Sequence, residues 1–241
     1  MSPHSPRTVF ITGASSGIGR ALAEEFGTRG DVVVAVARRK KELKELERSL
    51  RVKGEKCFPI VCDIGNERQV KSAVGSAFRR VRQIDILINN AGVTSFKNFL
   101  AMSPKEFHQV ISTNLTGTFL VTREIVRRML RRRRGLILNI LSYAAQTTYT
   151  GSAAYSASKA GGAAMMKVLR EEVRHQHIRI VNIYPGAVLT PIWHERHRKN
   201  YGHRMMKPDD LAAFVYEISR QPDAFTVEEV VMRPEHGDLK V

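Results

Sequence analysis

Tyr155 and Lys159 are the pair of residues in this chain best suited to acid–base chemistry. They lie four residues apart in the segment YSASK, and residues at that spacing share one face of a helix. A neighbouring ammonium group stabilises a phenolate, so we expect Lys159 to lower the pKa of Tyr155 from its usual value of about 10. Such a phenol can give or take a proton near neutral pH. The same spacing also occurs on ordinary helix surfaces, so the pair needs support from other residues.

Polar residues that follow apolar segments give that support. Ser142 follows LILNIL, the segment NNAG (89–92) ends IDILIN, and PGAVLT (185–190) follows IRIVNI. If the apolar segments are parallel strands, their carboxyl ends meet at one edge of a sheet, where ligands of open α/β sheets bind. Each polar segment has an alternative explanation as a turn. Together they place polar groups on one rim, which turns alone do not require.

The strands that would position these residues are visible as seven apolar segments. They cover residues 8–12, 32–37, 58–62, 84–89, 136–141, 178–183 and 227–232. Most are continuously apolar, as parallel strands covered on both faces are, and the residues between them have the 3.6-residue spacing of helices. This alternation predicts an α/β fold with a doubly wound, mostly parallel seven-stranded sheet and helices on both faces. No linker or repeat interrupts the pattern, so we expect one domain over residues 1–241.

A glycine-rich segment, TGASSGIG (12–19), joins the first strand to the first helix. Glycines there let the backbone approach a pyrophosphate, and the helix N-terminus supplies unpaired N–H groups. The spacing is GxxxGxG, not the GxGxxG of the usual dinucleotide fingerprint. A tight turn would use the same glycines, so the segment favours a nucleotide site without proving one.

Basic residues stand where a nucleotide's ribose would lie. The second strand is followed by Arg38, Arg39, Lys40 and Lys41, and no acid is present to hold a ribose 2′-hydroxyl. Arginine makes bidentate contacts to phosphate, so we expect NADP(H), with Arg38 as the first contact and Arg39 as the second. The alternative, a merely basic helix start, is disfavoured because cations oppose the helix dipole there. Asp63 would either accept a hydrogen bond from the adenine amino group or cap a helix.

Composition excludes several other functions. The chain has 39 Lys and Arg against 23 Asp and Glu, for a net charge of +16. The densest run, 127–134, is interpreted as a solvated helix end capped by Gly135, so we expect no nucleic-acid partner.

No apolar run of about 18 residues exists to span a membrane, and the N-terminus has no apolar leader. Cys57 and Cys62 point to opposite faces of one strand. We therefore expect a cytoplasmic protein without disulfides.

Taken together, the chain resembles the short-chain dehydrogenase/reductase family. The residues that carry the resemblance are TGASSGIG (12–19), NNAG (89–92), Asn114, Ser142, YSASK (155–159) and PGAVLT (185–190), in the order of the seven strands. The resemblance implies a Rossmann-like domain and hydride transfer between NADP(H) and a small carbonyl or secondary alcohol, such as a ketone, aldehyde or hydroxy acid.

By the same resemblance, Tyr155 is the general acid/base, Ser142 bonds the substrate oxygen, and Lys159 holds the nicotinamide ribose and lowers the Tyr155 pKa. Asn114 would hold a water that connects Lys159 to solvent. The implied cofactor contacts are Gly13, Ser15, Ser16, Gly17, Ile18, Gly19, Arg38, Arg39, Asp63, Asn90, Ala91, Gly92, Tyr155, Lys159, Pro185, Gly186, Val188 and Thr190. Helices at about 104–134 and 153–174 would pair in a homotetramer or homodimer.

Residues 191–207 should form a mobile substrate loop. The loop contains Trp193 and Tyr201 beside His194, His197 and His203, but no acid or cysteine completes an evident ligand set, so we expect no metal.

Two alternative functions remain. One is a 3-oxoacyl-[acyl-carrier-protein]-type reductase, although the last predicted strand leads into VVMRPEHG (230–237) rather than that family's Val-Asp/Asn-Gly-Gly turn. The other is a non-catalytic NADP(H) sensor, which would have no need of an intact Ser142, Tyr155 and Lys159.

Overall fold

Seven strands form one sheet in the order β3-β2-β1-β4-β5-β6-β7, within the residues 6–239 that the computed structural model describes. The strands are β1 Thr8–Thr12, β2 Val32–Ala37, β3 Cys57–Val61, β4 Ile86–Asn89, β5 Gly135–Ile140, β6 Ile178–Pro185 and β7 Glu229–Met232. Every pairing between neighbouring strands is parallel. The strand order reverses between β1 and β4. The predicted doubly wound α/β fold is confirmed.

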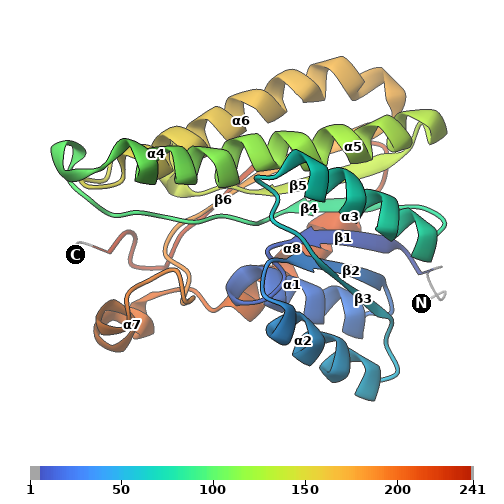
Figure 1. Ribbon diagram of the computed structural model, residues 1–241, viewed down its shortest axis with the longest axis horizontal. Coiled ribbons are helices and arrows are strands. Elements are labelled where there is room, and N and C mark those ends of the chain that lie inside the picture. The colour runs from blue at the N-terminus through green and yellow to red at the C-terminus, as the bar shows by residue number, and fades with distance from the viewer. Residues whose placement is uncertain (1–5, 240–241) are drawn as a thin grey trace.

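Helices cover both faces of this sheet (Figure 1). One face is covered by α1 (Gly17–Thr28), α2 (Lys40–Val52) and α8 (Pro208–Ser219), and the other by α3 (Glu67–Arg80), α5 (Gly117–Arg132) and α6 (Ala153–Val173). Helix α4 (Pro104–Ile111) runs into α5 through a π-helical segment, Ser112–Thr116. Helix α7 (Glu195–Tyr201) lies apart from these layers. Single 3-10 turns occupy Phe99–Ala101, Tyr143–Ala145, Arg174–Gln176 and Gly202–Arg204.

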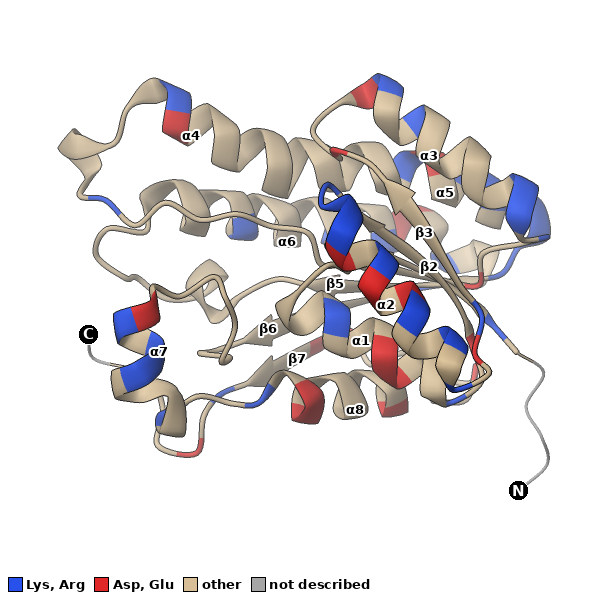
Figure 2. Ribbon diagram, turned by 60° about the horizontal axis from the view of Figure 1, so that its bottom comes forward, with Lys and Arg blue, Asp and Glu red and all other residues tan. Residues whose placement is uncertain are grey.

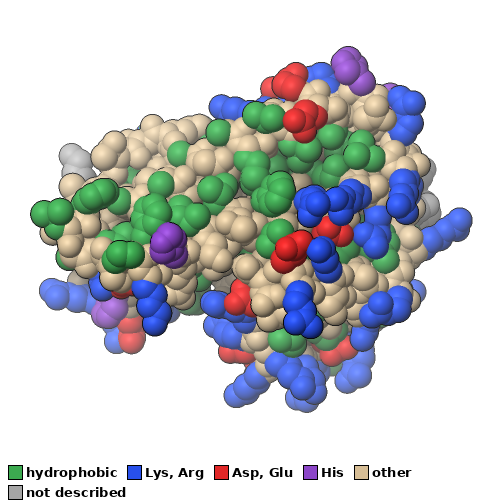
Figure 3. Space-filling view, turned by 45° about the horizontal axis from the view of Figure 1, so that its top comes forward, with side chains coloured by type: hydrophobic (Ala, Val, Ile, Leu, Met, Phe, Trp, Pro, Cys, Tyr) green, Lys and Arg blue, Asp and Glu red, His purple; other side chains and the backbone are tan. Residues whose placement is uncertain are grey.

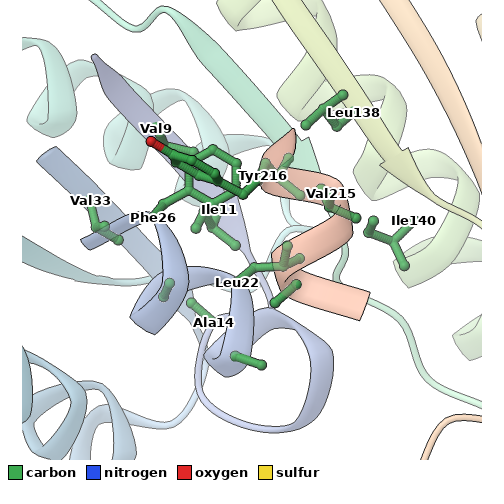
Figure 4. Packing of buried hydrophobic residues seen from close by; sticks show 14 of the residues in the cluster. Val9, Ile11, Ala14, Leu22, Phe26, Val33, Leu138, Ile140, Val215 and Tyr216 are labelled. Atoms are coloured by element: carbon green, nitrogen blue, oxygen red, sulfur yellow. The ribbon is translucent and has the colours of Figure 1, made fainter. Parts of the chain in front are cut away.

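The core lies on both sides of the sheet because successive side chains of a strand point to opposite faces. Val9 and Ile11 of β1 belong to the core under α1 and α8, whereas Phe10 packs on the other side with α3 and α5. In the first of these, the rings of Phe26 and Tyr216 meet edge to face with centroids 5.1 Å apart (Figure 4). The same alternation places Cys57 and Cys62 in different cores, as predicted.

Local signals fix where the helices begin and end. Helix α4 starts at a capping box, in which Ser103 and Glu106 bond each other's backbone N–H groups. The predicted Gly135 cap of α5 is wrong: the helix ends at Arg132, and Arg133 takes the left-handed conformation (φ +49°). Gly135 instead begins β5 and lies against Met129, whose sulfur a Cβ there would strike.

Three buried asparagines link the central strands near their carboxyl ends. Asn89, Asn139 and Asn182 are register partners on β4, β5 and β6. Asn89 Nδ2 donates to Asn139 Oδ1 at 2.9 Å, and Asn139 Nδ2 donates to Asn182 Oδ1 at 3.0 Å. This row of amides holds the three strands in register beneath the sheet edge.

Within residues 6–239, each helix is too short or too polar to cross a membrane.

Candidate active site

A cavity of about 780 Å³ runs along the carboxyl ends of the strands. It begins at the glycine-rich turn after β1, passes the ends of β2 to β6, and finishes at residues 238–239 of the C-terminal segment. Of the 20 predicted catalytic and cofactor residues, Asn114 and Gly19 are the two that do not line it. The structure therefore brings together residues that lie far apart in the sequence.

Tyr155 and Lys159 lie on the same face of α6, as their spacing predicted. The Lys159 ammonium group lies 5.7 Å from the centre of the Tyr155 ring, and its Nζ donates to the Ile140 carbonyl oxygen at 2.9 Å. Small residues elsewhere on α6, such as Gly162 and Ala163, let this helix pack on β6 and against Leu141.

The pKa values of this pair differ from expectation. Burial raises the pKa of Tyr155 above its usual value, and a hydrogen bond with Ser142 opposes that rise without reversing it. Burial also lowers the pKa of Lys159 to about 8. The predicted lowering of the Tyr155 pKa is therefore not produced by these contacts, because desolvation of the phenolate outweighs the stabilisation its neighbours provide.

Ser142 lies at the end of β5, where the chain turns into a 3-10 segment. Its Oγ accepts the Ala144 N–H at 3.1 Å, which fixes the side chain at the start of that turn. Ser142 and Tyr155 line the same cavity, and the Ser142 side chain opposes the rise in the Tyr155 pKa that burial causes. A carbonyl oxygen beside them would meet two donors.

Asn114 lies in the π-helical segment between α4 and α5 rather than in a regular helix. Its side chain accepts the Val93 N–H at 2.8 Å and donates to the Val93 carbonyl at 2.9 Å and to Ser158 Oγ at 3.0 Å. A Cβ on Gly92 would lie 3.4 Å from Asn114 Oδ1 and 3.6 Å from Lys159 Nζ. Asn114 thus fixes the chain after β4 next to the lysine.

The glycine-rich turn forms a narrow cradle. Gly13 and Gly17 have positive φ angles of +72° and +54°, and a Cβ on Gly19 would strike the Gly13 carbonyl and the Asn90 amide. Asn90 Nδ2 donates to Thr12 O at 3.0 Å, so this side chain braces the turn. Ser15, Ser16 and Ile18 line the cavity at the same turn, as do Ala91 and Gly92 opposite it.

Arginines flank the cradle at the end of β2. Arg39 donates from its guanidinium to Ser15 Oγ at 2.9 and 3.1 Å and also to Ser16 Oγ, whereas Arg38 is exposed and lines the same cavity. Figure 2 shows the basic start of α2 beside this edge of the sheet. The side chain tied to the turn is thus Arg39, the predicted second contact, and not Arg38.

Asp63 lies after β3 at the neighbouring edge. Its Oδ1 accepts the Gly65 N–H at 3.1 Å, whereas the side chain that caps α3 belongs to Asn66, which accepts the Gln69 N–H at 3.1 Å. The alternative that Asp63 caps a helix is therefore wrong, because α3 begins at Glu67 and its N-cap is Asn66.

The segment after β6 closes the opposite wall. The Gly186 N–H donates to Met232 O at 2.7 Å, which joins Pro185 and Gly186 to β7. Thr190 packs against Gly17, where a Cβ would lie 3.1 Å away, and the Val188 carbonyl accepts Trp193 Nε1 at 3.1 Å.

The predicted loop at 191–207 is largely helical. Helix α7 begins after His194, whose Nδ1 accepts the Arg196 N–H, and a Glu195–Lys199 pair one turn apart supports it. His194 and His197 come together with rings 6.3 Å apart. No three His, Cys, Asp or Glu side chains converge as metal ligands within residues 6–239.

Several lining residues were missed from the sequence. They include Thr94, Phe96, Tyr149, Asp238 and Leu239. The Thr94 hydroxyl is buried without a hydrogen-bond partner among the described residues. No motif marks these positions, because they reach the cavity through the path of loops and not through the ends of strands.

Comparison with known proteins identifies the family to which the chain is similar. The profile of the short chain dehydrogenase family matches residues 7–201. Sepiapterin reductase from Chlorobaculum tepidum is 34% identical over 96% of this chain and 98% of its own length. A 3-oxoacyl-acyl-carrier-protein reductase from Aquifex aeolicus is 31% identical over 92% of this chain and 93% of its own length.

Solved structures agree with these sequence matches. A metagenomic short-chain oxidoreductase in complex with NADP has a TM-score of 0.85 at 31% identity, over 97% of this chain and 99% of that one. An actinorhodin polyketide ketoreductase variant with NADPH has a TM-score of 0.89 at 27% identity, over 97% and 98% of the two chains. This chain therefore belongs to the short-chain dehydrogenase/reductase family.

Proposed function

We propose that this protein is an NADP(H)-dependent oxidoreductase that acts on a small carbonyl compound or secondary alcohol, with Tyr155 as the general acid/base. The observation that carries the proposal is the meeting of Ser142, Tyr155 and Lys159 in the same cavity as the glycine-rich turn. A proton donor and a hydrogen-bond donor for a carbonyl oxygen are thus placed next to a nucleotide cradle.

The residues fit the cofactor. The cradle formed by Gly13, Gly17 and Gly19 leaves no space for side chains, so backbone can approach a pyrophosphate closely. Arg38 and Arg39 suit a 2′-phosphate, and two of the structural relatives hold NADP or NADPH. When bound, the nicotinamide supplies or accepts a hydride. The predicted cofactor contacts remain our proposal, with Asn90 acting as a brace of the turn.

The chain's own groups perform the proton transfer. In reduction, the Tyr155 phenol gives its proton to the carbonyl oxygen as the carbon gains hydride, and solvent returns a proton to the phenolate. The raised pKa of Tyr155 keeps this phenol protonated at neutral pH, as a general acid must be. Ser142 donates a second hydrogen bond to the same oxygen, which stabilises its developing charge. Lys159 and Asn114 hold the surrounding segments in place.

We further propose that the chain forms one catalytic unit, with residues 191–207 covering the substrate. Copies would associate through α4, α5 and α6, whose outer surface carries exposed apolar side chains, including Phe119 (47% exposed) and Val168 (60%) (Figure 3). An apolar surface of this kind is typical of subunit contacts.

A carrier-protein reductase is the second candidate, since the Aquifex relative has that name. The surface near the cavity favours this function through exposed basic residues on α7, Arg196 and Lys199 (Figure 2). Against it, the segment after β7 turns back to line the cavity with Asp238 and Leu239.

The deciding experiment is Tyr155→Phe, with Tyr216→Phe as the matched control because Tyr216 is buried in the core and does not line the cavity. We expect Tyr155→Phe to lose NADPH-dependent reduction of aldehydes, ketones and keto acids by at least about 100-fold, with NADPH binding retained. Binding is measured by NADPH fluorescence. Normal turnover in Tyr155→Phe, or failure of the wild type to bind NADPH, would reject the proposal.

A further inference from the structure

A second, smaller cavity lies at the opposite edge of the sheet from the candidate active site. It has a volume of about 110 Å³ and is formed by the end of α6, the first residues of β6 and the segment that leads into β7. Its lining residues are all different from those of the larger cavity. Sites for drug-sized ligands take about 300–1,000 Å³, so this cavity suits a small ion.

Arginine side chains dominate the lining of this cavity. Arg170, Arg174 and Arg179 line it, beside His177 and one acid, Asp223. The Arg170 side chain is buried, with 7% of its surface exposed, and its Nε donates to a backbone carbonyl of β6 at 3.0 Å. A buried guanidinium group is thus held in a fixed position at the wall of the cavity.

Carboxylates satisfy two of these guanidinium groups only in part. Glu228 accepts a long hydrogen bond of 3.4 Å from Arg170 Nη1 and one of 2.8 Å from Arg174 Nη2. Arg174 uses its Nε and Nη2 for Glu171 and Glu228, so its Nη1 has no partner among the described residues. N–H donors therefore remain available at this cavity.

The third guanidinium group has a partner that a ligand could displace. Asp223 pairs with Arg179 Nη2 at 3.0 Å, but its side chain is 77% exposed, and exposed ion pairs contribute little stability. Arg133 donates to the His175 carbonyl at 3.1 Å, which brings the basic run 131–134 to this edge. Four arginines thus face three acids here in a chain of net charge +16, so the local field favours a further anion.

The turn between α6 and β6 brings the basic residues together at a cost. His177 has a φ of +55°, in the left-handed region that residues other than glycine seldom adopt. The tight turn reverses the chain so that Arg174 and Arg179 line the same cavity. Backbone strain of this kind is common at ligand sites.

We propose that this cavity binds a small oxyanion of the phosphate class through Arg170, Arg174 and Arg179. Guanidinium groups make paired, charge-assisted hydrogen bonds to phosphate oxygens, and the Thr226 hydroxyl in the same lining is a further donor. The ion takes the place of Asp223 on Arg179 and joins the end of α6 to the segment before β7. The proposal goes beyond the oxidoreductase activity and does not depend on it, because the two cavities share no residue.

Calorimetric titration with inorganic phosphate at constant ionic strength tests the proposal. A hydrogen bond to a charged group is worth about tenfold or more in affinity, so Arg174→Gln should weaken phosphate binding by at least that factor. Asp223→Asn should strengthen binding several-fold, because it removes a competing carboxylate. Arg131→Gln is the matched control, since Arg131 is exposed and does not line the cavity, and it should change the affinity by less than about twofold.

Two further titrations locate and identify the ion. Arg39→Ala should retain phosphate binding, because Arg39 belongs to the cofactor cradle. Glycerol 3-phosphate distinguishes the sources of the phosphate group: tighter binding than inorganic phosphate supports a site for a phosphomonoester, and weaker binding supports a site for the free ion.

Three results would overturn the proposal. They are no phosphate binding by the wild type at millimolar concentration, equal weakening by Arg174→Gln and Arg131→Gln, and loss of binding in Arg39→Ala but not in Arg174→Gln. The first excludes the site, the second reduces it to general charge, and the third places the ion in the cofactor cradle. If circular dichroism shows that Arg174→Gln is unfolded, Asp223→Asn decides the matter, because a folding defect cannot tighten binding.

Discussion

Replacing Lys159 by methionine should make the protein inactive but more stable at neutral pH. The Lys159 side chain is buried, with 7% of its surface exposed, and burial lowers its pKa from 10.5 to about 8. The structure provides one hydrogen-bond acceptor for its ammonium group, the Ile140 carbonyl. Methionine has a similar length and carries no charge, so it fills the same space without the desolvation cost.

The size and sign follow from proton linkage. A difference of about 2.5 pKa units corresponds to about 3 kcal/mol at 1.36 kcal/mol per unit, and losing the bond to Ile140 offsets about 1 kcal/mol of it. Below pH 8 Lys159 is charged in both the folded and unfolded states. The folded wild type therefore bears the full free-energy cost of burying the ammonium group. Between pH 8 and 10.5 the unfolded chain binds more protons than the folded one, so wild-type stability rises with pH.

Urea unfolding of both proteins at pH 7 and pH 9.5, at one protein concentration, measures this effect. We expect Lys159→Met to be about 2 kcal/mol more stable at pH 7, and the advantage to shrink by about 2 kcal/mol at pH 9.5. Lys167→Met is the control, because Lys167 lies on the same helix but is 54% exposed. A Lys159→Met protein that is less stable at pH 7, or an advantage independent of pH, would refute the reasoning.

Two further predictions concern the cofactor end. Arg38→Ala and Arg39→Ala should each weaken NADPH binding about 5- to 30-fold and NADH binding much less, with smaller effects at high salt; equal losses for both cofactors in fluorescence titrations would overturn the 2′-phosphate assignment. Gly19→Ala should abolish binding of both cofactors, because its Cβ would strike the Gly13 carbonyl; a variant that folds by circular dichroism and binds normally would contradict the cradle.

The fold could be predicted from the sequence because its strands are buried on both faces. Val32–Ala37 is apolar at every position, and its bounds were predicted correctly from that pattern. The predicted starts of two strands are two residues too early: the half-exposed edge strand β7 begins at Glu229 rather than residue 227, and the buried β4 begins at Ile86 rather than residue 84. Partial exposure weakens the apolar signal on which such bounds depend.

The site could be predicted only where strand ends and helix spacing determine position. Ser142, Tyr155 and Lys159 meet the glycine-rich turn for that reason. Asp238 could not be found, because it reaches the cavity through a loop whose path depends on the contacts of Arg233 with Tyr143. The pKa of Tyr155 was also mispredicted, since sequence spacing reports the neighbouring charge but not the depth of burial.

The buried asparagines explain how three neighbouring strands of the sheet are held in register. Asn89, Asn139 and Asn182 stand in register, so each amide can bond the next across the sheet. A slip of one residue would place an amide on the opposite face and leave buried polar groups unpaired, at a cost of about 1–3 kcal/mol each. The amides that set this register do not themselves line the cavity. Polar groups inside the sheet thus help to specify the register of the strands that lead into Ser142 and the other site residues.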